Sequence, residues 1–316
     1  MFWKKKYEKI KVDLNLYVCG YPRSGTTVIS NFLNSTKKFS SYTHKDMPLI
    51  LSPILWSKFS NVYYAGFKEI KRKHGDSLNI NLNYVDSFEE TIWKNFEKKS
   101  NFFGFYKKNI KKISYLKKST KFLSKSNQNL SRINLISENI YNAKFLIIYR
   151  NPISQLKSLL KVNDIFFKEI RNNNFFLQEL NFLGHFEFGP QRKFIFEDLK
   201  NLDEIKKNWF NGNFALSYIQ EWIDVHEMIL NNFIKRKNIK IINYDNLINN
   251  CKEETLNILK FSEVDVNEEV YKESLKIFDF KSSSEDYILN IKENKKLHKK
   301  ILIANNLYQK LSNIIT

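Results

Sequence analysis

The chain has 316 residues, 42% hydrophobic and 15% aromatic, so it can bury a substantial core and is not expected to be disordered. Its formal net charge of +19 suits anionic ligands or a lysine-rich solvated surface, and no nucleic-acid-binding signature accompanies it, so we expect no nucleic-acid partner. Two cysteines are too few for a disulfide framework.

The sequence shows no linker, repeat or long Gly/Pro/Ser tract, which predicts a single domain over residues 1–316. No apolar run is long enough to span a membrane, and the basic N-terminus is not followed by a signal-peptide core. We therefore expect a cytoplasmic protein without a transmembrane segment.

Near the N-terminus, the apolar run Leu16–Cys19 predicts a strand that breaks at Gly20. Beyond Thr27, apolar residues recur at helical spacing. The free N–H groups and the dipole at the start of a helix favour a bound anion. The loop between strand and helix supplies a cation, three hydroxyls and a glycine that allows close backbone approach: Arg23, Ser24, Thr26, Thr27 and Gly25. These features predict a phosphate-binding loop.

This loop differs from the loop of nucleotide kinases. Gly20 and Gly25 have the spacing of a Walker A motif, but Thr26 stands where that motif has its lysine. The cation is Arg23, whose planar guanidinium suits a phosphate or sulfate group. A P-loop nucleotide kinase is one alternative, which Thr26 disfavours. A non-catalytic nucleotide-binding or anion-binding protein is another.

A second motif begins with the apolar run Lys144–Tyr149, which has the composition of a buried parallel strand. Arg150 follows this strand, and Pro152 suits the first turn of a helix that would carry Ser158. Ligands bind at the carboxyl ends of strands in open α/β sheets. Taken alone, Arg150 could be a surface charge and Ser158 a small helix residue. The phosphate loop upstream favours a shared anion site.

Together the two motifs resemble those of sulfotransferases that use 3′-phosphoadenylyl sulfate (PAPS). Residues Pro22–Thr27 resemble the loop that holds the 5′-phosphosulfate of PAPS, and Arg150 with Ser158 resembles the pair that binds its 3′-phosphate. Ser119–Ile133 is similar to a lysine-containing segment of bacterial members, and Ile239–Leu247 to a late strand-and-helix element.

Three shorter segments, Lys45–Pro48, His74–Asp76 and Gly184–Gly189, resemble parts of a bacterial subgroup without characterised members. An arginine usually stands in that subgroup where this chain has Lys45. The likeness covers roughly residues 14 to 260. The Arg-Lys-Gly element with which animal cytosolic members contact adenine is not evident, so adenine recognition is unassigned.

The resemblance implies an α/β fold, with a central parallel sheet flanked by helices and a P-loop-like site at the strand ends. It implies transfer of a sulfuryl group from PAPS to a hydroxyl or amine, with release of adenosine 3′,5′-bisphosphate (PAP). No metal is expected, because arginine and lysine can supply the positive charge. Lys125 is expected to approach the transferred group. By analogy with the family, the acceptor is a bacterial surface glycan precursor or a related sugar or small molecule.

Two segments, residues 45–120 and 162–213, are expected to wall the acceptor pocket. Within the first, Phe67–His74 is expected to be helical, and Ser87–Glu90 has the spacing of a capping box that opens another helix.

The general base must take a proton from the acceptor. Asp46 lies 23 residues after Arg23 and matches the placement of a carboxylate base in glycan sulfotransferases, although it could instead orient Lys45 or cap a helix. His74, 51 residues after Arg23, is the second candidate and His44 the third.

Overall fold

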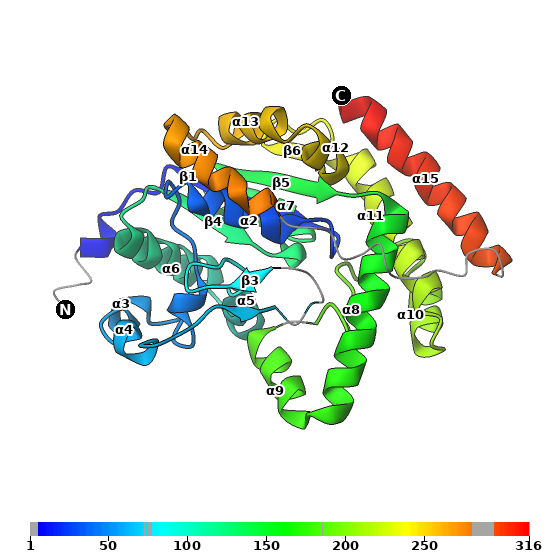
Figure 1. Cartoon of the computed structure of the whole chain (residues 1–316), viewed down its shortest axis with the longest axis horizontal. Helices are drawn as coiled ribbons and strands as arrows, with labels where there is room; N and C mark the ends of the chain where they lie inside the picture. Colours follow the sequence, from blue (N-terminus) through cyan, green and yellow to red (C-terminus); the bar gives the residue numbers. More distant parts are fainter. Residues whose placement is uncertain (1–5, 73, 75–77, 185, 280–293, 316) are drawn as a thin grey trace.

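The computed structural model describes residues 6–72, 74, 78–184, 186–279 and 294–315. Its centre is an all-parallel sheet of four strands in the order β4-β1-β5-β6 (Figure 1). The strands are β1 (Leu14–Gly20), β4 (Lys121–Lys125), β5 (Ala143–Tyr149) and β6 (Ile239–Asn243). A separate antiparallel pair consists of β2 (Ile70–Lys71) and β3 (Asn79–Ile80). The predicted α/β fold with a central parallel sheet is confirmed.

The sheet is buried on both faces, which explains the continuous apolar runs of its strands. Every residue of β1 is buried, and its side chains alternate between two hydrophobic cores. Leu14, Leu16 and Val18 belong to one core, and Tyr17 and Cys19 to the other. Burial raises the pKa of the Cys19 thiol, so this cysteine packs as a small hydrophobic residue.

One face of the sheet is covered by helices whose apolar residues share a core with Leu14, Leu16 and Val18. These helices are α2 (Thr26–Ser35), α12 (Tyr244–Asn249), α13 (Cys251–Phe261) and α14 (Glu268–Leu275), followed by the short η3 (Lys276–Phe278). The strand and helix expected over Ile239–Leu247 are both present, as β6 (Ile239–Asn243) and α12.

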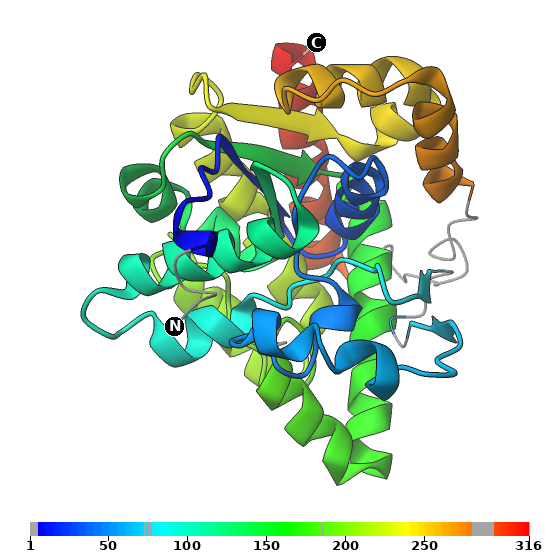
Figure 2. The same ribbon diagram turned by 90° about the vertical axis from the view of Figure 1, so that its left-hand side faces the viewer.

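The larger core lies on the opposite face, around Tyr17 and Cys19. Its helices are α5 (Glu90–Phe96), α6 (Phe102–Lys117), α7 (Ile133–Asn139), α8 (Pro152–Asn172), α9 (Asn174–Leu183), α10 (Leu202–Phe210), α11 (Phe214–Asn232) and α15 (Lys295–Ile315). Both views show α8 and α9 extending away from the sheet (Figures 1 and 2). Shorter elements are η1 (His44–Asp46), α3 (Pro53–Trp56), α4 (Ser60–Tyr63) and η2 (Asn127–Leu130).

Two local predictions in the segment 45–120 are wrong. The segment Phe67–His74 contains β2, in which Ile70 pairs with Ile80, because its few apolar residues find partners across a strand pair. The capping box at Ser87 does not form, since α5 begins at Glu90 without a side-chain cap. The side chains of Ser87 and Glu90 make other contacts, described below.

The carboxyl ends of the four strands lie at one edge of the sheet, because the strands are parallel. Each end leads directly into a turn or helix: β1 into the loop before α2, β4 into η2, β5 into α8 and β6 into α12. Residues far apart in the chain therefore meet at this edge. No helix among the described residues is long and apolar enough to cross a membrane.

Glu89 is buried beside this edge and gives a test of the fold. Burial raises the pKa of Glu89 to about 7, although the Tyr106 hydroxyl donates a hydrogen bond to Oε1 at 3.0 Å. Below about pH 7 the folded protein keeps a proton on Glu89 that the unfolded chain, with an ordinary glutamate pKa, has already lost. This proton favours the folded state, and its contribution to the free energy of unfolding is lost as the pH rises through about 7.

We expect Glu89→Gln to gain stability relative to the wild type as the pH rises from 5.5 to 8.5, by about 2 kcal/mol. Urea denaturation at both pH values measures this difference, with the exposed Glu138→Gln as a control. A pH-independent difference would contradict the burial of a titrating carboxyl group.

Candidate functional site

The loop between β1 and α2 has the backbone of an anion-binding loop. Gly25 lies at the N-cap position of α2 with φ of +101°, and no side chain caps the helix. Arg23 also has a positive φ, of +68°. The first N–H groups of the ten-residue helix thus remain available to a ligand. Ser24 Oγ is buried and has no hydrogen-bond partner among the described residues, as expected beside a site for an anion.

Both glycines of the loop are required by close packing. A Cβ atom at Gly25 would lie 2.2 Å from the Tyr244 ring, and one at Gly20 would lie 2.3 Å from the Ile148 carbonyl oxygen. Either contact is far shorter than van der Waals distance, so the loop can sit this close to β5 and α12 only with glycine at both positions.

The two anion-binding motifs meet, as the sequence predicts. Arg23 Nε donates a hydrogen bond to Ser158 Oγ on α8 at 3.0 Å, across 135 residues of chain. Arg150 follows β5, with its guanidinium 5.2 Å from the centre of the Tyr244 ring and its Nε 4.0 Å from an Asp245 carboxylate oxygen. The Tyr244 ring therefore touches both motifs.

Gln155 binds the backbone of the loop between β1 and α2, a role that was not predicted from the sequence. Its amide nitrogen donates to the carbonyl oxygens of Tyr21 and Pro22, at 3.1 and 2.7 Å. Its amide oxygen accepts a hydrogen bond from Trp222 Nε1 of α11 at 2.9 Å. Gln155 is fully buried, so a polar residue within the apolar stripe of the predicted helix was the available signal.

A buried ion pair lies beneath Tyr21. The Tyr21 hydroxyl donates to Glu221 Oε2 at 2.8 Å, and Glu221 pairs with Arg192. The Arg192 guanidinium lies over the rings of Trp209 and Tyr218, 4.5 and 4.2 Å from their centres. This pair joins the segment after α9 to α11.

Lys125 is the last residue of β4 and pairs in register with Val18 of the neighbouring strand β1. Its ammonium group lies 2.7 Å from Asp86 Oδ1 and donates to Ser87 Oγ at 3.1 Å. Asp86 in turn pairs with Arg72 at 2.8 Å. The Ser87 hydroxyl that sequence spacing assigned to a helix cap is thus a partner of Lys125.

Asn127, in the turn after β4, links the loop between β1 and α2 to the segment that carries Glu187. Thr26 Oγ1 donates to Asn127 Oδ1 at 3.0 Å, and Asn127 Nδ2 donates to Glu187 Oε1 at 2.7 Å. Thr26 and Asn127 are both buried. Neither Asn127 nor Glu187 was singled out from the sequence, although Glu187 lies within the segment Gly184–Gly189 that resembles a bacterial subgroup.

The structure does not bring Asp46 to the phosphate loop. Asp46 Oδ2 accepts hydrogen bonds from the backbone N–H and the hydroxyl of Thr43, both at 2.8 Å, which forms the capping box of η1. It also lies 3.2 Å from Lys117 Nζ at the end of α6, shortly before β4 begins. The side-chain contacts of Asp46 are thus with Thr43 and Lys117, and its role as the base stays a prediction.

The two candidate histidines lie in aromatic surroundings. The His74 ring is centred 5.2 Å from Phe166 of α8 and 6.4 Å from Phe188. His44 lies 5.3 Å from the ring of Phe67, and burial lowers the pKa of His44. His74 therefore lies beside the Glu187 segment, whereas His44 shares η1 with Asp46.

Comparison with protein families identifies the chain. The model of the sulfotransferase domain family matches residues 13–305. The chain belongs to this family. It is thus a sulfotransferase with PAPS as the sulfuryl donor, and membership leaves the acceptor open. No curated protein matches the chain significantly.

Solved structures similar to this sulfotransferase include several sulfotransferases from bacteria. Sulfotransferase STF1 from Mycobacterium tuberculosis H37Rv is 12% identical, with 95% of this chain and 80% of that chain covered and a TM-score of 0.48. The sulfotransferase domain of the Synechococcus PCC 7002 olefin synthase is 12% identical, with 96% of both chains covered and a TM-score of 0.42. A sulfotransferase from Alicyclobacillus acidocaldarius is 13% identical, with 96% and 95% covered and a TM-score of 0.42.

We expect Arg23→Ala to weaken PAP binding about tenfold to a hundredfold, because one charge-assisted contact to a bound anion contributes about 1.5–3 kcal/mol. Alanine and arginine are both L-residues at the same positive φ, so backbone strain changes little. Isothermal titration calorimetry measures the affinity, and Arg171→Ala on the exposed end of α8 is the control. Equal affinities of the Arg23 variant and the wild type would contradict the assignment of the loop.

Proposed function

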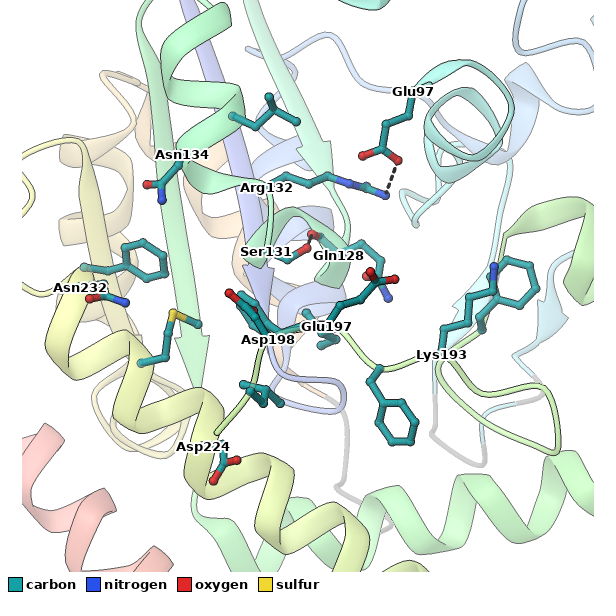
Figure 3. A pocket seen from close by; sticks show the side chains of 18 of the residues that line it. Glu97, Gln128, Ser131, Arg132, Asn134, Lys193, Glu197, Asp198, Asp224 and Asn232 are labelled. Carbon is teal, nitrogen blue, oxygen red and sulfur yellow. Dashed lines mark hydrogen bonds and ion pairs between the residues drawn. The ribbon is translucent and has the colours of Figure 1, made fainter. Parts of the chain in front are cut away.

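We propose that this sulfotransferase transfers the sulfuryl group of PAPS to a hydroxyl of a bacterial surface glycan precursor or a related sugar. The supporting observation is a cavity of about 1110 Å³ between the two segments expected to wall the acceptor pocket (Figure 3). Residues 90–98 of the first segment and 184–200 of the second line it, together with residues 128–135 and α11. One of the residues that line the cavity is Gln128, which directly follows Asn127 in the chain.

The lining of this cavity suits a sugar. Polar side chains around it include Gln128, Ser131, Glu197 and Asp198, which Figure 3 shows from close by. Phe186 and several other phenylalanines add apolar surface. A sugar presents hydroxyl groups to polar side chains and the C–H face of its ring to aromatic ones, whereas a flat apolar acceptor would leave these carboxylates unpaired.

The geometry of the strand ends supports the roles that we propose for the donor-binding residues. We assign the phosphosulfate to the loop residues Arg23, Ser24, Gly25, Thr26 and Thr27. The 3′-phosphate is assigned to Arg150 and Ser158. Lys125 is proposed to approach the transferred group, because Asp86 and Ser87 use two of its three N–H donors and the third can face an anion.

We further propose that residues 1–316 act as one domain and that the protein works in the cytoplasm, where PAPS is made. The two hydrophobic cores on opposite faces of one sheet support the first proposal. Arginine and lysine side chains supply the positive charge around the donor in this assignment.

We expect Arg150→Ala to reduce the preference for PAPS over adenosine 5′-phosphosulfate, which lacks the 3′-phosphate. The wild type should prefer PAPS strongly, because a site built around a charge rejects a ligand that leaves it unpaired. Competition of each donor with labelled PAP measures this preference, with Arg171→Ala as the control. A wild type that binds both donors equally would refute the 3′-phosphate assignment.

We expect Asp198→Ala to raise KM for a sugar acceptor up to about tenfold while KM for PAPS stays constant, because one hydrogen bond to the acceptor contributes about 0.5–1.5 kcal/mol. The assay is transfer from ³⁵S-labelled PAPS to a panel of sugars, glycan precursors, phenols and amines, with Glu138→Gln as the control. Transfer to phenols or amines in preference to every sugar would overturn the glycan proposal.

A further inference from the structure

We infer that Glu187 is the general base that takes the proton from the acceptor hydroxyl. This inference rests on the proposed function, because it places the acceptor in the cavity beside Asn127. It also assigns a role to the segment Gly184–Gly189, which contributes no residue to the proposed donor site.

The first support is the contact chain from the phosphate loop. Asn127 accepts a hydrogen bond from Thr26 with its amide oxygen and donates one to Glu187 with its amide nitrogen. One side-chain amide therefore separates the Glu187 carboxylate from the loop that holds the phosphosulfate. Gln128 and Phe186, the chain neighbours of Asn127 and Glu187, line the acceptor cavity. The carboxylate is thus one amide away from the donor loop, on the residue next in the chain to one that lines the cavity.

The second support is the state of the other carboxylates near the strand ends. Four of them lie within 4.0 Å of a guanidinium or ammonium group: Asp86 of Arg72 and Lys125, Glu90 of Arg132, Glu221 of Arg192, and Asp245 of Arg150. These four carboxylates are thus already engaged by a cation, and Glu89 beside the same edge is buried and accepts a hydrogen bond from Tyr106. Glu187 instead contacts the neutral amide of Asn127, and no ion pair reaches it within the described part of the chain.

The third support is the way the backbone holds Glu187 in place. Phe188 is buried, with its ring 5.3 Å from that of Phe166 on α8. The N–H of Gly189 donates to Asn163 Oδ1 of α8 at 3.2 Å, and Gly189 has a φ of +79°. A buried neighbour and a backbone hydrogen bond hold the backbone on both sides of Glu187 against α8, while Glu187 itself is half-buried.

The proposed step conserves atoms and charge. The acceptor oxygen forms a bond to sulfur while the bond between sulfur and the bridging phosphate oxygen breaks, and that electron pair leaves with PAP. The hydroxyl proton moves to the Glu187 carboxylate. The products are a sulfate ester, PAP and protonated Glu187, which returns its proton to solvent.

The decisive variant is Glu187→Gln, because glutamine keeps the size and can still accept the hydrogen bond from Asn127 but cannot take a proton. We expect kcat for the best acceptor of the panel to fall about 10²–10⁴-fold, with the PAP dissociation constant and the melting temperature unchanged. Glu187→Asp keeps a proton acceptor with a shorter reach and should recover part of kcat. Glu138→Gln is the matched control.

Each other outcome has a distinct meaning. If Glu187→Gln retains kcat within a few fold, the carboxylate only positions Asn127 and the inference is wrong. It is also wrong if Asp46→Asn or His74→Asn loses turnover while Glu187→Gln does not. A wild type that binds no PAP, or that binds it without transfer to any acceptor, would instead refute the proposed function, and the base assignment with it.

Discussion

The phosphate loop depends on the hydrogen bonds that Gln155 makes to its backbone. These bonds satisfy two carbonyl oxygens that a sharp loop would otherwise bury without partners. Gln155 can make them because Trp222 fixes the other end of its amide, which ties the loop to α8 and α11 together. A ligand then meets a preformed loop and does not have to order it on binding.

The layer next to this amide is also polar. Tyr21 and Arg192 both donate to Glu221 Oε2 in the interior, and the guanidinium lies over the aromatic rings of Trp209 and Tyr218. Buried polar groups are costly when they lose a partner, so such a network favours one arrangement of its helices over alternatives. The segment that carries Arg192 also carries Glu187, and the same ion pair thereby helps to locate both walls of the cavity.

Sequence reasoning succeeded where the signal is local. The strand, loop and helix around Gly25 could be predicted from hydrophobic spacing and the conformational freedom of glycine. The strand before Arg150 and the helix that carries Ser158 could be predicted from an apolar run followed by a proline. The meeting of Arg23 with Ser158 could be expected, because parallel strands place both motifs at one edge. Asn127 and Glu187 could not be found in this way, because their roles depend on which distant loops pack together. Gln155 gave one signal, a polar residue within the apolar stripe of a helix, but its partners also depend on the fold.

Local signals also misled where tertiary contacts competed for the same side chains. Ser87 and Glu90 have the spacing of a capping box, yet Lys125 takes the hydroxyl and Arg132 the carboxylate. Asp46 also has a local role, since it caps a 3₁₀ turn, and its assignment as the base from family spacing stays a prediction. A carboxylate or hydroxyl near a helix start has several possible partners, and only the fold decides among them.

The Tyr244 ring has a consequence for how this site can change over evolutionary time. It packs against Gly25 on one side and lies under Arg150 on another, so a single side chain supports residues assigned to the phosphosulfate and to the 3′-phosphate of the donor. A smaller residue at position 244 would relax the constraint on Gly25 and remove the surface beneath Arg150 in the same step. The two motifs are therefore expected to vary together across relatives, even though 125 residues of chain separate them.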